Sequence, residues 1–261
     1  MTEHIGRVSL EKRDHVLLLG LDRVQKRNAF DHYMIDELSQ ALTDYENDAD
    51  LRCAIIFAHG EHFTAGLDLV QLQSKMSSGI FSSDPNIINP WGTSGRLRKK
   101  PVIVAVHGYC YTAGIELMLN ADISIAQSNT QFAQLEVLRG ILPFGGASSR
   151  FVKAAGWNKA MRYLLTGDTF NAQQALDMNL ICEVTEDNPL KRALELAHSI
   201  ATAAPLAVQA TIAAAKDAIE MNETEAFKQL NQHLVPLLGT SDVQEGVYTM
   251  LERRTPRFQG K

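Results

Sequence analysis

Residues 108–122 read GYCYTAGIELMLNAD, and this stretch decides more about the fold than any other part of the chain. It follows a short apolar run, residues 102–106, of the kind that forms a strand covered on both faces. Ala113 and Gly114 then open a helix, which places backbone N–H groups and the positive end of the helix dipole at the turn. Glu116 lies in the first turn among apolar neighbours, where a carboxylate is costly unless it is paired or used. Taken alone, Glu116 is explained equally well by structure and by function.

A second strand-to-helix turn precedes this stretch at residues 62–68, which read HFTAGLD. It follows another continuous apolar run, residues 53–58. The small Ala65 and the adjoining Gly66 leave backbone N–H groups exposed and approachable by a ligand. Such turns are common, so this segment by itself indicates function only weakly.

A third segment lies downstream at residues 132–146, which read FAQLEVLRGILPFGG. It places a second carboxylate, Glu136, among apolar residues. Arg139 follows three positions later, at the spacing of a helical ion pair. Two interpretations of Glu136 therefore stay open, a structural ion pair and a functional carboxylate.

The N-terminal region has the pattern of a strand hairpin followed by a helix. Residues 7–10 and 16–21 are predicted strands, and the charged residues 11–14 are the predicted hairpin turn. Asp31 is a predicted N-cap for the helix that follows. The apolar face of that helix recurs at three- and four-residue steps and comprises Ile35, Leu38, Leu42 and Tyr45.

The middle of the chain is typical of an α/β fold. Three apolar runs without alternation, residues 53–58, 102–106 and 123–126, predict strands that helices cover on both faces. Strand signals fade after about residue 130. The sequence therefore predicts a mixed α/β front and an all-helical tail.

The second half of the chain carries the helical part of that prediction. Residues 145–180 have the pattern of short helices, and residues 189–254 the pattern of helix after helix. The predicted breaks are Gly156, Gly167, Asn179, Pro205, Pro236 and Gly239.

Residues 74–100 are rich in Ser, Pro, Gly and Asn and predict one long loop. Long loops inside compact domains are usually functional or disordered. This loop ends in a basic cluster, for which a solvated edge and a contact for a phosphorylated ligand both stay open. The cluster comprises Arg96, Arg98, Lys99 and Lys100.

Composition excludes several classes of function. The chain has 261 residues, 45% apolar and 21% charged, a profile typical of one globular α/β fold. A net charge of −5 without a long basic run makes nucleic acid a poor partner. The N-terminus lacks a basic region followed by an apolar one, and no apolar segment reaches about 18 residues, so neither a secretory signal nor a membrane span is expected.

Cysteine and histidine usage points to no metal centre. Cys53, Cys110 and Cys182 are odd in number and widely spaced, which favours small buried side chains in a reducing cytoplasm. The eight histidines show no ligand spacing. Those near the turns, His59, His62 and His107, are predicted to be ordinary hydrogen-bonded side chains.

Taken together, the three segments resemble the crotonase, or enoyl-CoA hydratase/isomerase, superfamily in order and spacing. The resemblance covers nearly the whole chain and implies a crotonase (ClpP/crotonase-like) α/β spiral of repeated ββα units over residues 1–200. Residues 201–261 would then be a helical trimerisation region. The features that carry the resemblance are residues 28–30 (NAF), 65–68 (AGLD), 108–122, 134–143, 165–168 (LTGD) and 256–258 (PRF).

The resemblance also implies an active site. In the family two backbone N–H groups form an oxyanion hole, and the matching positions are Ala65 and Ala113. Ala113 stands where the family usually has glycine. The catalytic glutamates of family hydratases match Glu116 and Glu136, which lie 20 residues apart in the sequence. The remaining substrate-binding positions implied are Lys26, Arg27, Ala29, Gly66, Leu67, Asp68, Tyr109, Gly114 and Phe144.

Two departures from the family pattern concern the acyl site. Leu135 stands where hydratases usually have proline, and the run Phe144-Gly145-Gly146-Ala147 replaces a more glycine-rich one. The bulky Phe144 leaves the chain length and shape of the substrate open.

The activity implied is that of a hydro-lyase that adds water across the 2,3 double bond of a 2-enoyl-CoA thioester. Glu136 would be the principal acid/base and Glu116 its partner in activating the water. Coenzyme A would be part of the substrate, and no metal or redox cofactor is implied. An enoyl-CoA isomerase and a non-catalytic or RNA-binding member are the alternatives. A trimer or a dimer of trimers in the cytoplasm is the expected setting.

Overall fold

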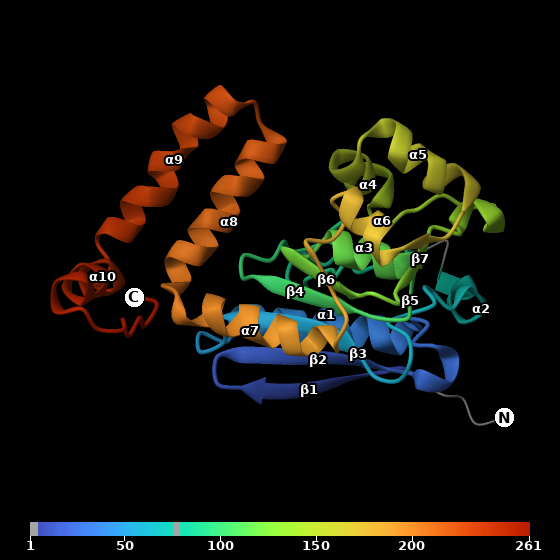
Figure 1. The fold of residues 1–261 in the computed structure, drawn as a ribbon, viewed down its shortest axis with the longest axis horizontal. Helices are drawn as coiled ribbons and strands as arrows, with labels where there is room; N and C mark the ends of the chain where they lie inside the picture. The colour runs from blue at the N-terminus through green and yellow to red at the C-terminus, as the bar shows by residue number, and fades with distance from the viewer. Residues whose placement is uncertain (1–4, 76–78) are drawn as a thin grey trace.

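The computed structural model describes residues 5–75 and 79–261. It begins with a hairpin of β1 (Arg7–Arg13) and β2 (Val16–Asp22), which pair antiparallel (Figure 1). The predicted hairpin is confirmed, but the predicted turn was too long. Arg13 pairs with Val16, so only Asp14 and His15 lie in the turn, and Asp14 adopts a φ of 51°. Charged side chains continue β1 because this edge strand faces solvent.

Parallel strands follow, as the apolar runs predicted. In the described part of the chain, β3 (Cys53–Ala58), β4 (Val102–Val106) and β6 (Ile123–Gln127) extend the sheet from β2, all parallel. Leu19 and Ile56 belong to a core on one face, while Leu18 and Ile55 belong to a second core on the other. The alternation explains why these strands are apolar throughout.

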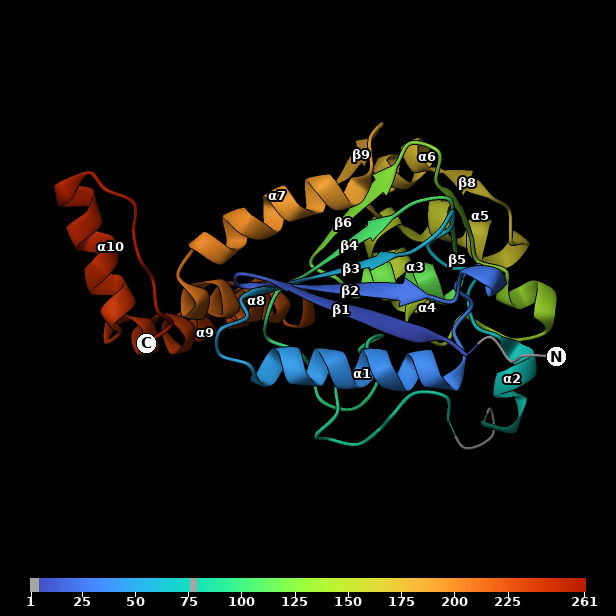
Figure 2. The ribbon, with the colours of Figure 1, turned by 90° about the horizontal axis from the view of Figure 1, so that it is seen from below.

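Two helices cover the faces of this sheet, and Figure 2 shows them on opposite sides. The first is α1 (His32–Asn47), whose predicted N-cap is confirmed because the Asp31 side chain accepts from the Met34 N–H. The second is α7 (Pro189–Thr202), which packs on β3 and β4 through Ala193 and Ala197.

A second, smaller sheet consists of β5 (Tyr109–Tyr111), β7 (Gln131–Ala133) and β8 (Phe170–Asn171), and β9 (Glu183–Thr185) joins β6 at the edge of the first sheet. The prediction that strands end near residue 130 is therefore wrong. These strands have two or three residues each, too few for a periodic pattern.

The two sheets are built by a repeated step. The first-sheet strands β4 and β6 are each followed by a short second-sheet strand, β5 and β7. After β3 the chain makes a single bridge in the corresponding place, Thr64 with Cys110. This repetition brings the predicted functional turns at 62–68 and 108–114 side by side.

Short helices follow as predicted. They are η3 (Glu136–Arg139), α4 (Ala147–Ala155), α5 (Trp157–Thr166) and α6 (Ala172–Asp177). The predicted breaks are confirmed here, because Gly156, Gly167 and Asn179 all adopt positive φ values between the helices.

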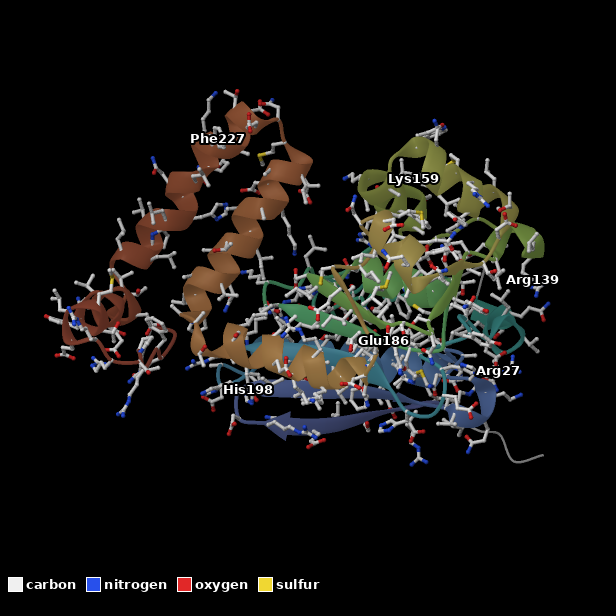
Figure 3. The ribbon with its side chains drawn as sticks, viewed as in Figure 1. Arg27, Arg139, Lys159, Glu186, His198 and Phe227 are labelled. Atoms are coloured by element: carbon white, nitrogen blue, oxygen red, sulfur yellow. The ribbon has the colours of Figure 1, made fainter. Side chains whose placement is uncertain are left out.

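The C-terminal helices extend away from the sheets (Figure 1). They are α8 (Pro205–Glu220), α9 (Glu223–Leu238) and α10 (Ser241–Glu252). Every residue of α8 is described and none is buried. Figure 3 shows Phe227, on α9, at the opposite end of the molecule from Arg139. A region that projects in this way buries little of its own apolar surface.

Two of the predicted breaks in this region are confirmed and one is wrong. Pro205 opens α8, and Gly239 caps α9. Pro236, however, lies inside α9. The helix ends only two residues later, so proline disturbs just its last turn.

The predicted loop at 74–100 is confirmed over residues 79–100, which contain no helix or strand and only one isolated bridge, Ile88 with Gly95. Its predicted start is wrong, because Ser74 and Lys75 belong to a short 3-10 helix. It follows α2 (Leu69–Leu72) and η2 (Gln73–Lys75). Its centre is packed into the protein, with Trp91 fully buried at 0% exposure.

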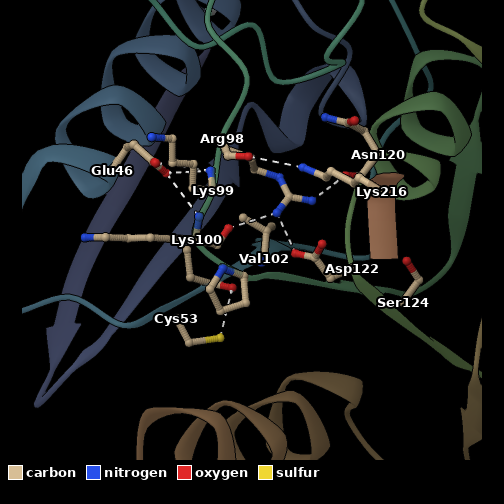
Figure 4. A network of polar contacts seen from close by, with 12 residues as sticks. Glu46, Cys53, Arg98, Lys99, Lys100, Val102, Asn120, Asp122, Ser124 and Lys216 are labelled. Atoms are coloured by element: carbon tan, nitrogen blue, oxygen red, sulfur yellow. Dashed lines mark hydrogen bonds and ion pairs between the residues drawn. The ribbon is translucent and has the colours of Figure 1, made fainter. Parts of the chain in front are cut away.

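Two members of the basic cluster, Arg98 and Lys100, are neither solvated nor free to contact a phosphorylated ligand (Figure 4). Arg98 is buried, donates to Asp122 at 2.5 Å and also donates to the Asn120 carbonyl. Lys100 is buried and donates from Nζ to the carbonyls of Tyr45 and Asp48. These cations fasten the loop to the core.

The same network reaches the C-terminal helices and α1 (Figure 4). Lys216 on α8 donates to the Arg98 carbonyl at 3.1 Å. The Glu46 carboxylate accepts from the backbone N–H groups of Lys99 and Lys100. The end of the loop is thereby held by α8, by α1 and by residues 120–122.

The three cysteines are free thiols; Cys53 and Cys110 are buried as predicted, whereas Cys182 is exposed, contrary to the prediction. In the described ranges no single helix has the length and apolarity to cross a bilayer. The helices α7 and α8 together have the length and composition of a membrane span, but the chain bends by 107° between them.

Candidate active site

In the turn at residues 64–67, some backbone N–H groups already donate hydrogen bonds within the protein and one does not. The Ala65 N–H donates to the Arg27 carbonyl at 2.9 Å, and the Gly66 N–H donates to Thr64 Oγ1 at 3.0 Å. The contact of Ala65 contradicts the prediction that its N–H serves the oxyanion hole. Within residues 5–75 and 79–261 the structure gives no acceptor for the Leu67 N–H. Leu67 therefore offers the free donor in this turn.

The second turn begins α3 (Ala113–Leu119), as the sequence predicted. Its N-cap, Thr112, has φ 48° and ψ −113°, a rare conformation for a β-branched residue. Ala113 is buried in the main core, and the described part of the chain gives no acceptor for its N–H. A buried backbone donor without an acceptor is uncommon, which marks this N–H for a ligand.

The two turns are in contact. A Cβ built on Gly66, whose φ is 98°, would overlap Thr112 Oγ1. A Cβ built on Gly114 would likewise overlap the Thr64 methyl. Glycine at both positions thus lets the two turns approach closely. Gly114 therefore has a packing role, and its predicted contact with substrate stays a prediction.

The carboxyl group of Glu116 lies beside these turns, and the residue is only 2% exposed. Its Oε1 accepts from the Ala147 N–H at 3.1 Å. A Cβ on Gly145 would lie 2.5 Å from its Oε2, so that glycine allows the backbone to approach the carboxylate. Burial raises the pKa of Glu116 to about 7, against the opposing effect of the nearby backbone N–H groups.

Glu136 opens η3 and is 6% exposed. Its Oε2 is buried and has no hydrogen-bond partner among residues 5–75 and 79–261. Burial, and after it the charge of Glu116, raises the pKa of Glu136 to about 7. Among the described residues Arg139 makes no ion pair with it, so the interpretation as a structural ion pair is not realised. A buried, unpartnered carboxyl oxygen usually has a functional explanation.

Two side chains that the sequence did not single out support this site. Trp91 donates from Nε1 to the Ala113 carbonyl at 2.8 Å. Arg150 donates to the Trp91 carbonyl at 2.7 Å, the Gly92 carbonyl at 3.1 Å and the Gly145 carbonyl at 3.3 Å. Trp91 is one of two tryptophans in the chain and stands in a loop rich in Pro and Gly. A large aromatic residue in such a loop was the sequence feature that could have identified it.

The predicted coenzyme A positions are partly brought together. Lys26 and Arg27 are exposed, and the Arg27 guanidinium lies 5.9 Å from the centroid of the Tyr109 ring. Tyr109 stacks on His62 at 4.1 Å and on Tyr111 at 4.8 Å. The two exposed cations thus lie at a cluster of half-buried aromatic rings, a combination that can bind phosphate and a base.

Two other predicted binding positions have structural partners. The Asp68 carboxylate accepts from Arg23 at 2.9 Å and from the Gln71 N–H at 3.3 Å, so it caps α2 and pairs with a buried cation. The Ala29 carbonyl accepts from the same Arg23 at 2.9 Å. For Asp68 these contacts give the carboxylate a structural role, and its predicted contact with substrate stays a prediction.

The histidines near the turns are hydrogen-bonded, as predicted. His59 Nε2 contacts Ser9 Oγ at 2.7 Å, His107 Nε2 contacts the Gly60 carbonyl at 2.9 Å, and His62 Nδ1 accepts from the Tyr109 N–H at 3.3 Å. No group of three or more His, Cys, Asp or Glu among the described residues could hold a metal ion.

Comparison with known proteins gives matches over nearly the whole chain. A sequence model of the family described as enoyl-CoA hydratase/isomerase matches residues 11–261. The chain is 34% identical to enoyl-CoA hydratase EchA19 of Mycobacterium tuberculosis, covering 97% of this chain and 96% of that protein. It is 32% identical to 2,3-dehydroadipyl-CoA hydratase of Escherichia coli, covering 97% and 98%.

The solved structures agree. A crystal structure of a probable enoyl-CoA hydratase/isomerase from Mycobacterium abscessus superimposes with a TM-score of 0.93 at 43% identity, covering 97% of this chain and 98% of that one. An enoyl-CoA hydratase from Mycobacterium tuberculosis gives a TM-score of 0.88 at 31% identity, covering 97% and 99%. The similarity therefore includes both sheets and the C-terminal helices.

Proposed function

The chain belongs to the enoyl-CoA hydratase/isomerase family, and on that premise we propose that it adds water across the 2,3 double bond of a 2-enoyl-CoA thioester. The predicted family and crotonase fold are confirmed. One observation carries the proposed activity: Glu116 and Glu136 are both buried, and both have a pKa raised to about 7. Carboxyl groups with such pKa values can donate and accept protons near neutral pH.

The thioester oxygen would accept hydrogen bonds from the N–H groups of Leu67 and Ala113. As water adds, negative charge grows on this oxygen, and fixed donors stabilise it without reorganising. Loss of one such donor typically costs about 3–4 kcal/mol of transition-state stabilisation. The contact between Gly66 and Thr112 supports this assignment, because it joins the two turns that carry the donors.

The glutamate pair would handle the protons. The water oxygen bonds to C3, one proton of the water passes to a glutamate carboxylate, and a proton passes from a glutamate carboxyl group to C2. The carbon–carbon π bond is lost, and the pair returns to its starting protonation. Because the two groups interact, the resting proton belongs to the pair and not to one residue.

The contacts of the two glutamates support different roles. Glu116 is held by the Ala147 N–H, which suits a group that orients the water. Glu136 has a buried oxygen to which no described residue donates a hydrogen bond, which suits the principal acid/base. These are the roles that the sequence predicted.

The alternatives differ in what they require of the pair. An isomerase moves a double bond with one carboxylate as proton shuttle, so the second glutamate would have no task. A non-catalytic member would bury two acidic groups without using them, although burial of carboxylates is costly. Two buried carboxyl groups therefore favour hydration over both alternatives.

Substrate binding would rest on the exposed cations Lys26 and Arg27 and on the half-buried ring of Tyr109. The cations would contact the phosphates of coenzyme A, and Tyr109 would offer an aromatic face. Coenzyme A is part of the substrate in this scheme. No metal or redox cofactor is needed, because the backbone donors stabilise charge and the glutamates transfer protons.

The C-terminal helices would pack against further copies of the chain, as a trimer or a dimer of trimers in the cytoplasm. They expose many large apolar side chains, which favours an interface. Light scattering that shows a stable monomer at micromolar concentration would contradict this assembly. The exposed apolar residues include Ile219, Phe227, Leu230, Leu234, Val235, Leu238, Val247, Tyr248, Met250 and Leu251.

The direct test of the activity is a panel of acyl-CoA thioesters. Incubation with crotonyl-CoA should remove the absorbance of the conjugated enoyl group, and mass spectrometry should find one added water. A 3-enoyl-CoA tests the isomerase alternative. A protein that shifts the 3-enoyl double bond but never hydrates the 2-enoyl thioester would overturn the proposal.

A further inference from the structure

We propose that the hydroxyl group of Thr112 is a third hydrogen-bond donor to the thioester oxygen, beside the backbone N–H groups of Leu67 and Ala113. The inference rests on the proposed function and adds a catalytic residue to its site. Thr112 is the one residue between β5 and α3, directly before Ala113. Its backbone conformation, its unused hydroxyl group and the place of that hydroxyl group all support this role.

The backbone conformation of Thr112 is one that its side chain disfavours. A φ of 48° with a ψ of −113° resembles the first central position of a type II′ turn, which glycine usually occupies. Two contacts hold the residue there: its N–H donates to the Ala133 carbonyl at 2.9 Å, and its carbonyl accepts from the Glu116 N–H at 3.2 Å. Strained residues of this kind concentrate at active sites. Since glycine would fit this backbone better, the threonine side chain needs another explanation.

The hydroxyl group of Thr112 does not make the contact that its position would ordinarily give it. Thr112 is the N-cap of α3, and an N-cap threonine usually accepts a hydrogen bond from a backbone N–H in the first turn of its helix. Here the side chain makes no such bond. Across residues 5–75 and 79–261 the structure gives its hydroxyl group no hydrogen-bond partner. Because Thr112 is only partly buried, a ligand can reach it.

The hydroxyl oxygen lies between the two turns that carry the backbone donors. A Cβ built on Gly66 would overlap Thr112 Oγ1, so this oxygen touches the backbone at Gly66. Leu67, which has one free N–H, directly follows Gly66. Ala113, which has the other, directly follows Thr112. The hydroxyl group is therefore adjacent to both donor-bearing peptide groups and lies where an oxygen atom that accepts from both would meet it.

A third donor suits the negative charge that grows on the thioester oxygen during hydration. A carbonyl oxygen has two lone pairs, which the two N–H groups would fill, whereas an enolate-like oxygen has a third. The Thr112 hydroxyl can rotate about its Cβ–Oγ1 bond and donate to that third lone pair as the charge develops. Because this contact is stronger in the transition state than with bound substrate, it should raise kcat more than it lowers KM.

The kinetic experiment compares wild type with Thr112→Val and Thr112→Ser on crotonyl-CoA. Thr112→Val keeps the branched shape and removes the hydroxyl group, so kcat should fall by at least about tenfold with little change in KM. Thr112→Ser keeps the hydroxyl group and should keep kcat close to the wild-type value. Normal kcat in Thr112→Val would overturn the inference.

Thr112→Gly separates a catalytic role from a structural one. Glycine relieves the strained backbone, so this variant should melt no lower than wild type, yet its kcat should fall as in Thr112→Val. A threonine that served only the fold would not show this combination. Asp14→Gly, at a φ of 51° in the turn between β1 and β2, is the control for relief of a positive φ and should keep wild-type kcat. Wild-type kcat in Thr112→Gly would overturn the inference.

Binding of a chromophoric thioester separates this inference from the proposed function, because it needs no turnover. In 4-(dimethylamino)cinnamoyl-CoA the amino group pushes electrons onto the thioester oxygen. The absorbance band therefore moves to longer wavelength as the hydrogen bonds to that oxygen become stronger. Wild type and Thr112→Ser should shift the band of the bound ligand further than Thr112→Val does, and this result would support the inference even if no thioester is hydrated. The same band position in wild type and Thr112→Val would overturn it.

Discussion

Glu116 and Glu136 come from different turns of the fold, yet the charge of Glu116 adds to burial in raising the pKa of Glu136. The first residue lies in α3 and the second opens η3. Each is surrounded by apolar residues, and neither has a cation bonded to its carboxylate within the described ranges. The pair thus stores a proton near neutral pH, which is the property that the proposed hydration uses.

Stability should fall as pH rises, because of this pair. Both folded pKa values, about 7, lie above the ordinary 4.5, so the folded state holds more protons than the unfolded chain between these values. The stability that comes from burying these two carboxyl groups in their neutral form is fully present below pH 4.5 and is lost as pH rises through 7. At about 1.4 kcal/mol for each pKa unit, the difference is at most about 3.5 kcal/mol for each group.

Glu116→Gln and Glu136→Gln should remove that dependence. Thermal melting at pH 5 should place each variant close to wild type, and melting at pH 8 should place each above it. A variant that melts below wild type at pH 8 would show that the charged form is stabilised in the fold. Glu186→Gln, at an exposed site that Figure 3 labels, is a control for a general charge effect.

Gly66→Ala should disable the site, because the added Cβ would overlap Thr112 Oγ1 and the φ of 98° is unfavourable for alanine. We expect kcat to fall by at least about 10²-fold, as for the loss of an oxyanion donor. Gly156→Ala is matched for backbone strain, with φ 77° and nothing near its Cβ, and should keep normal kcat. Adding Thr112→Gly to Gly66→Ala should restore part of the activity; no recovery would argue against the collision as the cause.

Trp91→Phe tests whether the loop positions α3. The substitution keeps an aromatic ring but removes the N–H that donates to the Ala113 carbonyl at 2.8 Å. We expect a stability loss of about 1–3 kcal/mol from the unsatisfied carbonyl. A fall in kcat of about tenfold or more should accompany it, with little change in KM. Trp157→Phe, at a 68% exposed position, should change neither. Unchanged kcat in Trp91→Phe would reduce its role to packing.

The double variant Lys26→Ala/Arg27→Ala tests the coenzyme A surface. Loss of two exposed cations should raise KM more than it lowers kcat, and the effect should shrink as salt is added. Steady-state kinetics at low and high ionic strength would measure this. Lys191→Ala, an exposed cation on α7, is the control. If KM for the thioester stays at the wild-type value, the two residues are solvated surface charges.

The sequence predicted the parts of the fold that have long, regular patterns. The bounds of β3 and β4 and the N-cap of α1 follow from continuous apolar runs and from Asp31. The strands β7 and β8 escaped because two or three residues carry no period. A local hydrophobic pattern predicts a helix or strand only when that helix or strand is long enough for the pattern to repeat.

The sequence predicted the two glutamates of the site well, but it predicted the backbone N–H donors of the oxyanion hole less well. Glu116 and Glu136 stand out as charges in apolar segments. Which N–H of the first turn is free depends on Arg27, whose carbonyl occupies the Ala65 donor from far away in the sequence. Contacts of this kind depend on tertiary structure, and they also decided that Arg98 would be buried against Asp122.

The central claim is that two glutamates act as a unit on one water, and a double-mutant cycle tests it most directly. Crotonyl-CoA hydration would be measured for Glu116→Gln, Glu136→Gln and the double variant, with ligand affinity measured alongside. We predict that each single variant loses at least about 10²-fold in kcat and keeps nearly normal ligand affinity. The kcat of the double variant should be little lower than that of the less active single variant. Normal hydration by Glu116→Gln would contradict the account.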